Sequence, residues 1–115
     1  MKLAIPRFGE TVAPCFEHSA TITIIEFDGR REVDRTDFTL KTRVEFDRIR
    51  LLRDQEVDTL ICGGVQQHFE DMIKTHGIQV ISWVEGTVEE ILELFLQGRL
   101  QPGADARQTR APGTD

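Results

Sequence analysis

The spacing of apolar residues divides the first hundred positions into short strands and amphipathic helices. Five segments are continuously apolar or rich in β-branched residues, which is typical of strands: residues 3–5, 21–27, 32–40, 59–62 and 78–83. Asp28-Gly29 separates the second and third of these segments and is a strong signal for a two-residue hairpin turn. The continuous apolar run at 59–62 predicts a strand that is covered on both faces.

Three helices are predicted from apolar residues that recur at three- and four-residue spacing. The segment Thr42-Arg43-Val44-Glu45 fits a capping box that opens the first helix, and Thr87-Val88-Glu89-Glu90 fits one that opens the third. Between them, the apolar positions of residues 65–73 predict a second helix that ends at Gly77. Gly98 stands where a helix C′ residue belongs, so the third helix is expected to end just before it.

The order of these elements predicts one α/β domain over residues 1–100. Helices that alternate with strands give parallel neighbours through right-handed crossovers, and the hairpin adds two antiparallel strands on the other side. We therefore expect a five-stranded mixed sheet with strand order 3-2-1-4-5 and three helices, which is the ribonuclease H-like arrangement. Residues 101–115 contain no large apolar residue and predict a disordered C-terminal tail.

A ligand site is expected where the strand order reverses, between the first strand and the strand at 59–62. Open α/β sheets bind ligands outside the carboxyl ends of their strands at such a switch point. The loops that meet there, residues 7–19 and 62–67, contain both cysteines and His18, and His68 lies just inside the following helix. Thiols and imidazoles that are distant in the sequence are therefore expected to lie close together.

Two residues separate Cys15 from His18, a spacing at which a thiol and an imidazole can bind one metal ion from a single loop. The same spacing also fits a half-buried cysteine beside a surface histidine. Cys62 ends a buried strand, where it is either a ligand or a small core hydrophobe. His68 and His76 are interpreted on this pattern alone as solvated or helix-capping residues.

The Gly63-Gly64 pair directly precedes the second predicted helix. Two residues without Cβ let backbone N–H groups approach a ligand closely, and a helix N-terminus favours negative charge. A phosphate or an anionic metal–sulfide cluster would suit this bend, and the alternative is a tight strand-to-helix turn without a ligand. The pair matches neither the dinucleotide fingerprint nor a P-loop.

Charge and motifs narrow the functional class. The formal net charge of −6 argues against nonspecific binding to nucleic acid or to an anionic membrane. We expect a cytoplasmic protein with both cysteines reduced, because the sequence shows neither a secretory signal nor a membrane-spanning apolar run. No Gly-x-Ser-x-Gly or Cys-x-x-Cys motif occurs, and the first strand offers no carboxylate for a nuclease metal pair. The chain is therefore predicted to be a binding protein rather than an enzyme.

Several stretches, spread in order over about residues 1–100, resemble one protein family. They are residues 2–6, 12–16 with Ala20, 57–64, 77–81, and 84–90 with 96–100. Together they are similar to the dinitrogenase iron–molybdenum cofactor biosynthesis family, which includes small carriers of nitrogenase cofactor precursors and the orange protein, which holds a molybdenum–copper sulfide cluster. Many members have Phe-Gly or Phe-Asp where this chain has Phe16-Glu17.

The resemblance implies a ribonuclease H-like protein of nitrogen fixation or a related pathway. Such a protein binds and delivers a metal–sulfur cluster of the iron–sulfur or iron–molybdenum–sulfur type. Its partners would be cluster-assembly or acceptor proteins, and the sequence leaves open whether the chain is a monomer or a weak dimer. The cofactor-binding residues that the resemblance implies are Cys15, His18, Cys62, Gly63 and Gly64. The metal ligands that it implies are Cys15, His18, Cys62 and His68. The alternatives are a zinc site and a ligand-free regulatory or interaction domain of the same fold.

Overall fold

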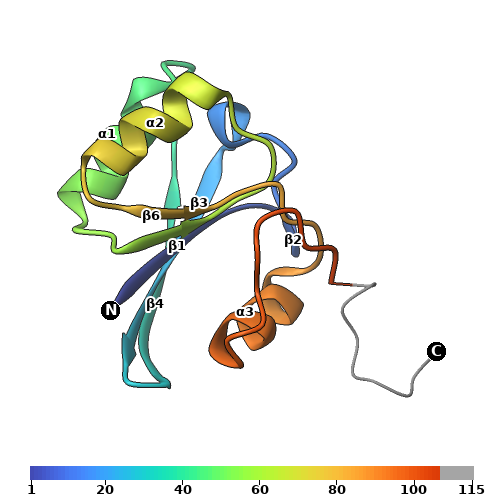
Figure 1. Ribbon diagram of the computed structural model, residues 1–115. Helices are drawn as coiled ribbons and strands as arrows, with labels where there is room; N and C mark the ends of the chain where they lie inside the picture. Colours follow the sequence, from blue (N-terminus) through green and yellow to red (C-terminus); the bar gives the residue numbers. More distant parts are fainter. Residues whose placement is uncertain (107–115) are drawn as a thin grey trace.

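Residues 1–106 are described in the computed structural model, where a mixed β-sheet lies between helices on both faces (Figure 1). The strands are β1 (Lys2–Phe8), β2 (Thr11–Val12), β3 (Thr21–Asp28), β4 (Arg31–Thr39), β5 (Thr59–Ile61) and β6 (Gln79–Ile81). The α-helices are α1 (Phe46–Asp54), α2 (Gln67–Thr75) and α3 (Val88–Leu96), and a short 3₁₀ helix covers Phe16–His18. None of these helices has the length and apolar character needed to cross a membrane.

The order of the strands in the sheet is β4-β3-β1-β5-β6, and β2 pairs with β1 outside this path. The β3–β4 hairpin lies antiparallel beside β1, whereas β5 and β6 lie parallel on its other side. The five strands expected from the sequence are therefore present, with the switch point between β1 and β5. The sheet differs from the prediction by its sixth strand, β2.

The additional strand exists because β1 is longer than its apolar run suggests. Pro6 does not end β1, which continues to Phe8. Although proline has no N–H to donate, the Pro6 carbonyl accepts a hydrogen bond from the N–H of Ala13 at 2.9 Å. Gly9, at a φ of +62°, then turns the chain back so that β2 pairs with β1. The predicted loop over residues 7–19 is therefore wrong for its first part.

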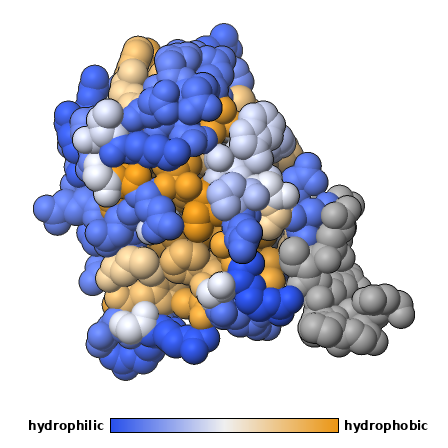
Figure 2. Space-filling model, viewed as in Figure 1, coloured by the Kyte–Doolittle hydropathy of each residue, from blue (hydrophilic) through white to orange (hydrophobic). Residues whose placement is uncertain are grey.

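Each face of the sheet has its own apolar core. Helices α1 and α2 cover one face, and α3 covers the other (Figure 1). Because successive residues of a strand point to opposite faces, Leu60 packs in the core under α1 and α2, while Ile61 packs in the core under α3. Both faces of β5 are thus buried, as its continuous apolar run predicts. Figure 2 shows hydrophobic surface between the polar surfaces of the two helical layers.

The ends of α3 follow local sequence signals. The Thr87 side chain accepts a hydrogen bond from the Glu90 backbone, and the Glu90 side chain accepts one from the Thr87 N–H, which is the predicted capping box. Gly98, at a φ of +70°, follows the helix, and Gly77, at +78°, follows α2 in the same way. Both glycines occupy the left-handed conformation that ends helices.

The capping box predicted at residues 42–45 is wrong. Helix α1 begins at Phe46 and has no side-chain cap. The Thr42 hydroxyl instead accepts a hydrogen bond from the N–H of Val44, at 3.0 Å. The buried guanidinium of Arg48 donates to the backbone carbonyls of the same two residues. These contacts hold the segment as a turn outside the helix.

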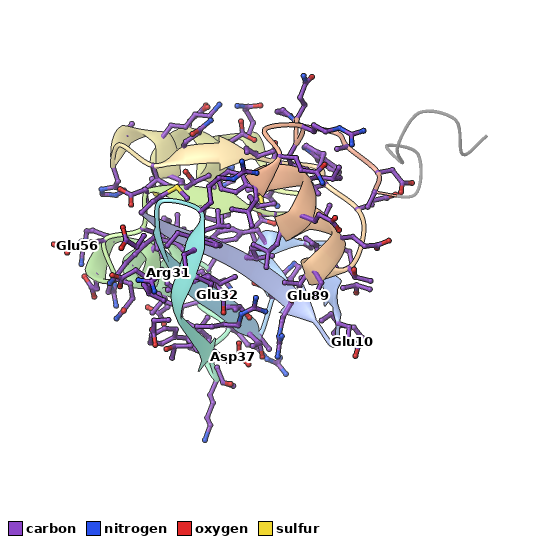
Figure 3. All side chains as sticks on the ribbon, turned by 90° about the horizontal axis from the view of Figure 1, so that it is seen from below. Glu10, Arg31, Glu32, Asp37, Glu56 and Glu89 are labelled. Carbon is purple, nitrogen blue, oxygen red and sulfur yellow. The ribbon has the colours of Figure 1, made fainter. Side chains whose placement is uncertain are left out.

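The ion pair of Arg35 with Glu89 ties the β3–β4 hairpin to α3. Arg35 on β4 donates to Glu32 at 2.6 Å and to Glu89 at 2.7 Å. Figure 3 labels Glu32 on β4 and Glu89 at the start of α3. Pairs this exposed contribute about 1 kcal/mol or less, so they orient the hairpin more than they stabilise the fold.

Residues 101–106 pair with the segment that follows β6. The Glu85 N–H donates to the Ala104 carbonyl, and the Ala106 N–H donates to the Glu85 carbonyl, both at 2.9 Å. Ala106 is buried in the core under α3. The expected tail therefore does not begin at residue 101, because backbone pairing and a small buried side chain need no large apolar residue. The rest of that tail, 107–115, lies outside the described residues.

Candidate functional site

Two segments that are distant in the sequence join at the switch point through backbone hydrogen bonds. The Gly64 N–H donates to the Pro14 carbonyl at 2.7 Å, and the Phe16 N–H donates to the Gly64 carbonyl at 2.8 Å. Cys15 and Gly64 thus form a parallel bridge. We call this contact of residues 14–16 with Gly63-Gly64 the junction. It brings together the two loops that the strand order predicts to meet.

The two glycines are needed for the close approach of backbone to backbone. A Cβ at Gly63 would collide with the carbonyl oxygen of Ala13, and one at Gly64 would lie 2.9 Å from the carbonyl oxygen of Pro14. The Gly64 N–H is already bonded to that oxygen. The structure therefore gives these glycines a packing role at the junction, which corresponds to the tight turn that the sequence offered as the alternative to an anion site.

Cys62 lies inside the core under α1 and α2 with no exposed surface. The same core contains Phe16, Val65 and Phe69. Burial raises the pKa of the thiol to about 12, with smaller contributions from the negative charges of Glu70 and Glu17. The thiol is therefore protonated near neutral pH and packs as a small hydrophobic group.

Cys15 is the more accessible thiol, since its side chain is half-buried. Its Sγ donates a hydrogen bond to Glu17 Oε2 at 3.0 Å. Burial, this hydrogen bond and the negative charge of Glu17 together raise the pKa of Cys15. The sulfur is thus reachable from solvent but is held in its protonated form.

Glu17 is a site residue that the sequence analysis did not single out. Its side chain is only 3% exposed. While Oε2 accepts the Cys15 thiol, Oε1 accepts the backbone N–H of Gln66, the N-cap of α2, at 2.6 Å. A carboxylate at this position also complements the positive end of the helix dipole. The one signal for it in the sequence was an acidic side chain two positions after Cys15.

The histidines lie at the surface. His18, His68 and His76 are all exposed, and the His68 ring stacks on Phe69 with ring centroids 4.2 Å apart. Among residues 1–106, no three His, Cys, Asp or Glu side chains gather in a group that could hold a metal ion. The four predicted metal ligands, including the two cysteines, are therefore not preassembled.

A cleft of about 460 Å³ opens beside the junction, on the side of the sheet that α3 covers. Its lining includes residues that follow β1 and β5, on the two sides of the switch point where a ligand site is expected, and residues that follow β6. Its lining consists of Thr11, Val12, Pro14, Gly63, Gly64, Trp83, Val84, Glu85, Gly86, Thr87 and Glu90. Both predicted glycines line it, but neither cysteine does.

Trp83 is a second site residue that the sequence pattern did not indicate. It follows β6 at a φ of +62°, a left-handed conformation that is unfavourable for a bulky side chain. Its N–H donates to the Gly63 carbonyl at 2.9 Å, and its ring lies so close to Gly64 that a Cβ there would be 3.1 Å from it. The indole is nevertheless 63% exposed. The backbone therefore presents a large aromatic surface at the mouth of the cleft.

Comparisons with known proteins show a shared fold and one matching family. The fold is similar to that of PH0822, with a TM-score of 0.79 and 18% identity over 89% of this chain and 94% of that one. It is similar to a Methanocaldococcus jannaschii protein proposed to be a dinitrogenase (TM-score 0.75, 19% identity, 88% and 92% of the chains). It is also similar to the apo orange protein of Desulfovibrio gigas (TM-score 0.72, 19% identity, 88% and 91% of the chains). No curated protein matches the sequence. The model of the family described as "Dinitrogenase iron-molybdenum cofactor" matches residues 1–98, so the chain belongs to that family.

Proposed function

We propose that this chain binds a metal–sulfur cluster or its precursor, of the iron–molybdenum type, as cargo and delivers it to an acceptor protein without catalysing a reaction. The proposal rests on the junction, which keeps the accessible thiol of Cys15 at the ligand-binding edge of the sheet. Membership of a family that is named for such a cofactor supports it.

Cys15 is proposed as the first protein ligand of the cargo. Thiolate sulfur is a soft donor that suits the metals of sulfide clusters. A metal must displace the thiol proton, and the raised pKa of Cys15 means that this displacement becomes easier as the pH rises. The hydrogen bond to Glu17 fixes the position of the sulfur until the metal arrives.

The other predicted ligands would join only with rearrangement or from the surface. Cys62 would have to leave its buried position, whereas His18 and His68 are exposed donors. Gly63 and Gly64 would support the site by holding Cys15 in place. A cargo with few protein ligands keeps open coordination positions that an acceptor protein can take, as transfer by ligand exchange requires.

The proposal includes a ribonuclease H-like classification, which is supported by the strand order and by the antiparallel strands beside β1. It does not include nuclease chemistry, because Leu3, Ala4 and Ile5 of β1 are buried apolar residues that supply no carboxylate for a metal pair. The expected setting is the cytoplasm, with cluster-assembly or acceptor proteins as partners and a monomer or weak dimer as the working form.

Anaerobic reconstitution with iron, molybdate and sulfide, followed by gel filtration, tests the proposal. The wild-type chain is expected to elute with a visible chromophore that contains metal and sulfide, and Cys15→Ser is expected to lose it. Cys62→Ala is the matched control. If that variant folds and also loses the chromophore, the buried thiol must become a ligand during loading.

Two outcomes would end the cluster proposal. The first is a wild-type chain that stays colourless after reconstitution. The second is one zinc ion per purified chain without sulfide, which would replace the cluster by a zinc site built on Cys15 and His18. Metal and sulfide analysis of the same samples distinguishes these results.

A further inference from the structure

The backbone donors along the cleft are largely used within the fold. Five N–H groups of its lining donate to backbone carbonyls of the same chain: Val12 to Gly86, Gly64 to Pro14, Trp83 to Gly63, Val84 to Cys62 and Glu85 to Ala104. The N-terminus of α3 would otherwise attract an anion. It is closed by the capping box and by the Glu10 carbonyl, which accepts the Val88 N–H. An anionic ligand therefore has little to bind in this cleft.

The same cleft has features that suit a cation. Glu85 and Glu90 line it, and none of the described residues that line it is Lys, Arg or His. Both carboxylates have partners in the fold, Glu90 through the capping box. They would therefore attract a cation through their negative charge, and the proposal does not need either carboxylate to have an unbonded oxygen. The indole of Trp83 forms one wall of the cleft, and an indole face attracts guanidinium groups.

We propose that this cleft docks a partner protein, and that its occupant is an arginine side chain on an exposed segment of that partner. A planar guanidinium stacks on an indole, which the compact ammonium group of lysine cannot do. The two carboxylates would complement the positive charge and disfavour partners with acidic surfaces at this position.

Exposed aromatic side chains favour a protein occupant over a free small cation. Trp83 is 63% exposed, and Phe8, which pairs with Thr11 across the β1–β2 hairpin, is 78% exposed. Because Thr11 lines the cleft, Phe8 lies next to the same surface. Aromatic residues and arginine are enriched in protein interfaces, where contact with a partner buries them. Cys15 is not part of the lining, so a partner can dock while cargo is held on the other side of the junction.

Trp83 also makes the proposal directly measurable. It is the sole tryptophan and the chain contains no tyrosine, so the intrinsic fluorescence of the protein reports on the cleft. Metal-free protein is titrated with the peptide acetyl-Ala-Ala-Arg-Ala-Ala-amide, and a saturable, salt-sensitive change in emission is expected. A citrulline peptide of the same shape but without charge should bind about tenfold more weakly.

Two variants of α3 provide the matched comparison. Glu90→Gln removes a charge from the cleft but keeps the capping box, since Gln also fits that position, and should weaken the arginine peptide by about threefold or more. Glu93→Gln changes the same helix outside the cleft and should bind like the wild type.

Three results would overturn the proposal. The emission shows no saturable change, the citrulline peptide binds as tightly as the arginine peptide, or Glu90→Gln binds the arginine peptide as tightly as the wild type does. Equally tight binding of L-argininamide would also overturn it, because the cleft would then accept a free small cation. Since no metal is present, this test is independent of the cluster reconstitution.

Discussion

The two sides of the junction differ in how completely the fold satisfies their polar groups. On the side of α1 and α2, the Cys15 thiol and the Gln66 N–H share the buried carboxylate of Glu17, and Cys62 is enclosed in the core. On the side of α3, the same backbone forms the wall of an open cleft that carries the exposed indole of Trp83. Neighbouring residues of one extended segment thus belong to a closed network and to an open surface.

This difference indicates that the two sides bind in different ways. A ligand at Cys15 has to displace a proton and a hydrogen-bond partner, so its binding should depend on pH. A partner in the cleft only covers existing surface and compensates charge, so its binding should depend on salt. The closed side, the open side and the junction between them can each be tested separately.

The junction itself should be the most sensitive point. Gly63→Ala is expected to lower the free energy of unfolding by about 3 kcal/mol or more, because its Cβ would collide with the Ala13 carbonyl oxygen. Gly9→Ala is the control, since a Cβ there meets nothing within 4 Å, and only the left-handed backbone should cost about 1 kcal/mol. Urea denaturation measures both variants. Equal losses would show that the junction is not tightly packed.

Removal of the shared carboxylate should open the closed side. Glu17→Ala is expected to lower the free energy of unfolding by about 2 kcal/mol, because the Gln66 N–H at the start of α2 loses its buried acceptor. Glu17→Gln retains an acceptor oxygen and should lose less. Chemical denaturation of the two variants against the wild type measures this difference.

Glu17→Gln also tests how Glu17 controls the pKa of Cys15. The hydrogen bond and charge of Glu17 raise the pKa of Cys15, so Glu17→Gln should lower that pKa and speed alkylation by iodoacetamide at pH 8. The measurement is made in a Cys62→Ala background, where only Cys15 can react. Unchanged or slower alkylation would show that Glu17 does not hold the thiol in its protonated form.

Cys62 should make the core under α1 and α2 sensitive to alkali. Its pKa rises from a usual value of 9.0 to about 12 in the folded chain, so the unfolded chain loses this proton first. The stability that depends on the protonated thiol is complete below about pH 9 and is lost as the pH rises toward 12, at up to about 1.4 kcal/mol per unit. Denaturation of the wild type and of Cys62→Ala between pH 8 and 10.5 should show the extra loss in the wild type alone, and parallel curves would contradict the assignment.

The smallest change in stability is expected on the open side. Trp83→Asn places a residue that tolerates left-handed backbone at this position. It should leave the free energy of unfolding unchanged or raise it by up to about 1 kcal/mol, while binding of the arginine peptide, measured by calorimetry, is lost. A decrease in the free energy of unfolding by more than about 1 kcal/mol would show that the indole stabilises the fold and is not kept for binding a partner.

A control for backbone strain is available in the same chain. Among residues 1–106, Glu56 is the other non-glycine residue with a positive φ, at +57°. It lies on the far side of the molecule from Glu10 and Glu89, which are close to the start of α3 (Figure 3). Glu56→Gly should relieve comparable strain and leave peptide binding unchanged. Reduced binding in this variant would mean that the loss in Trp83→Asn is indirect.

Much of the architecture could be predicted because it depends on local patterns and on the order of the elements. The capping box at residues 87–90 and the glycines after α2 and α3 act within a single turn of chain. The meeting of the two loops at the switch point follows from right-handed crossovers between parallel strands. The sequence also contained enough family-specific stretches to identify the family that the match over residues 1–98 confirms.

The chemistry of the site could not be predicted, because it depends on which way each side chain faces after distant segments have packed. A step of one residue along an extended segment moves a side chain to the opposite face. Pro14 therefore lines the cleft, while Cys15 bonds to Glu17 on the other side. Glu17 is buried against the N–H of Gln66, 49 positions later in the chain. Contacts across such separations have no local period, so the chain order brings the two loops together and long-range packing assigns each of their side chains to the core, the hydrogen-bond network or the open cleft.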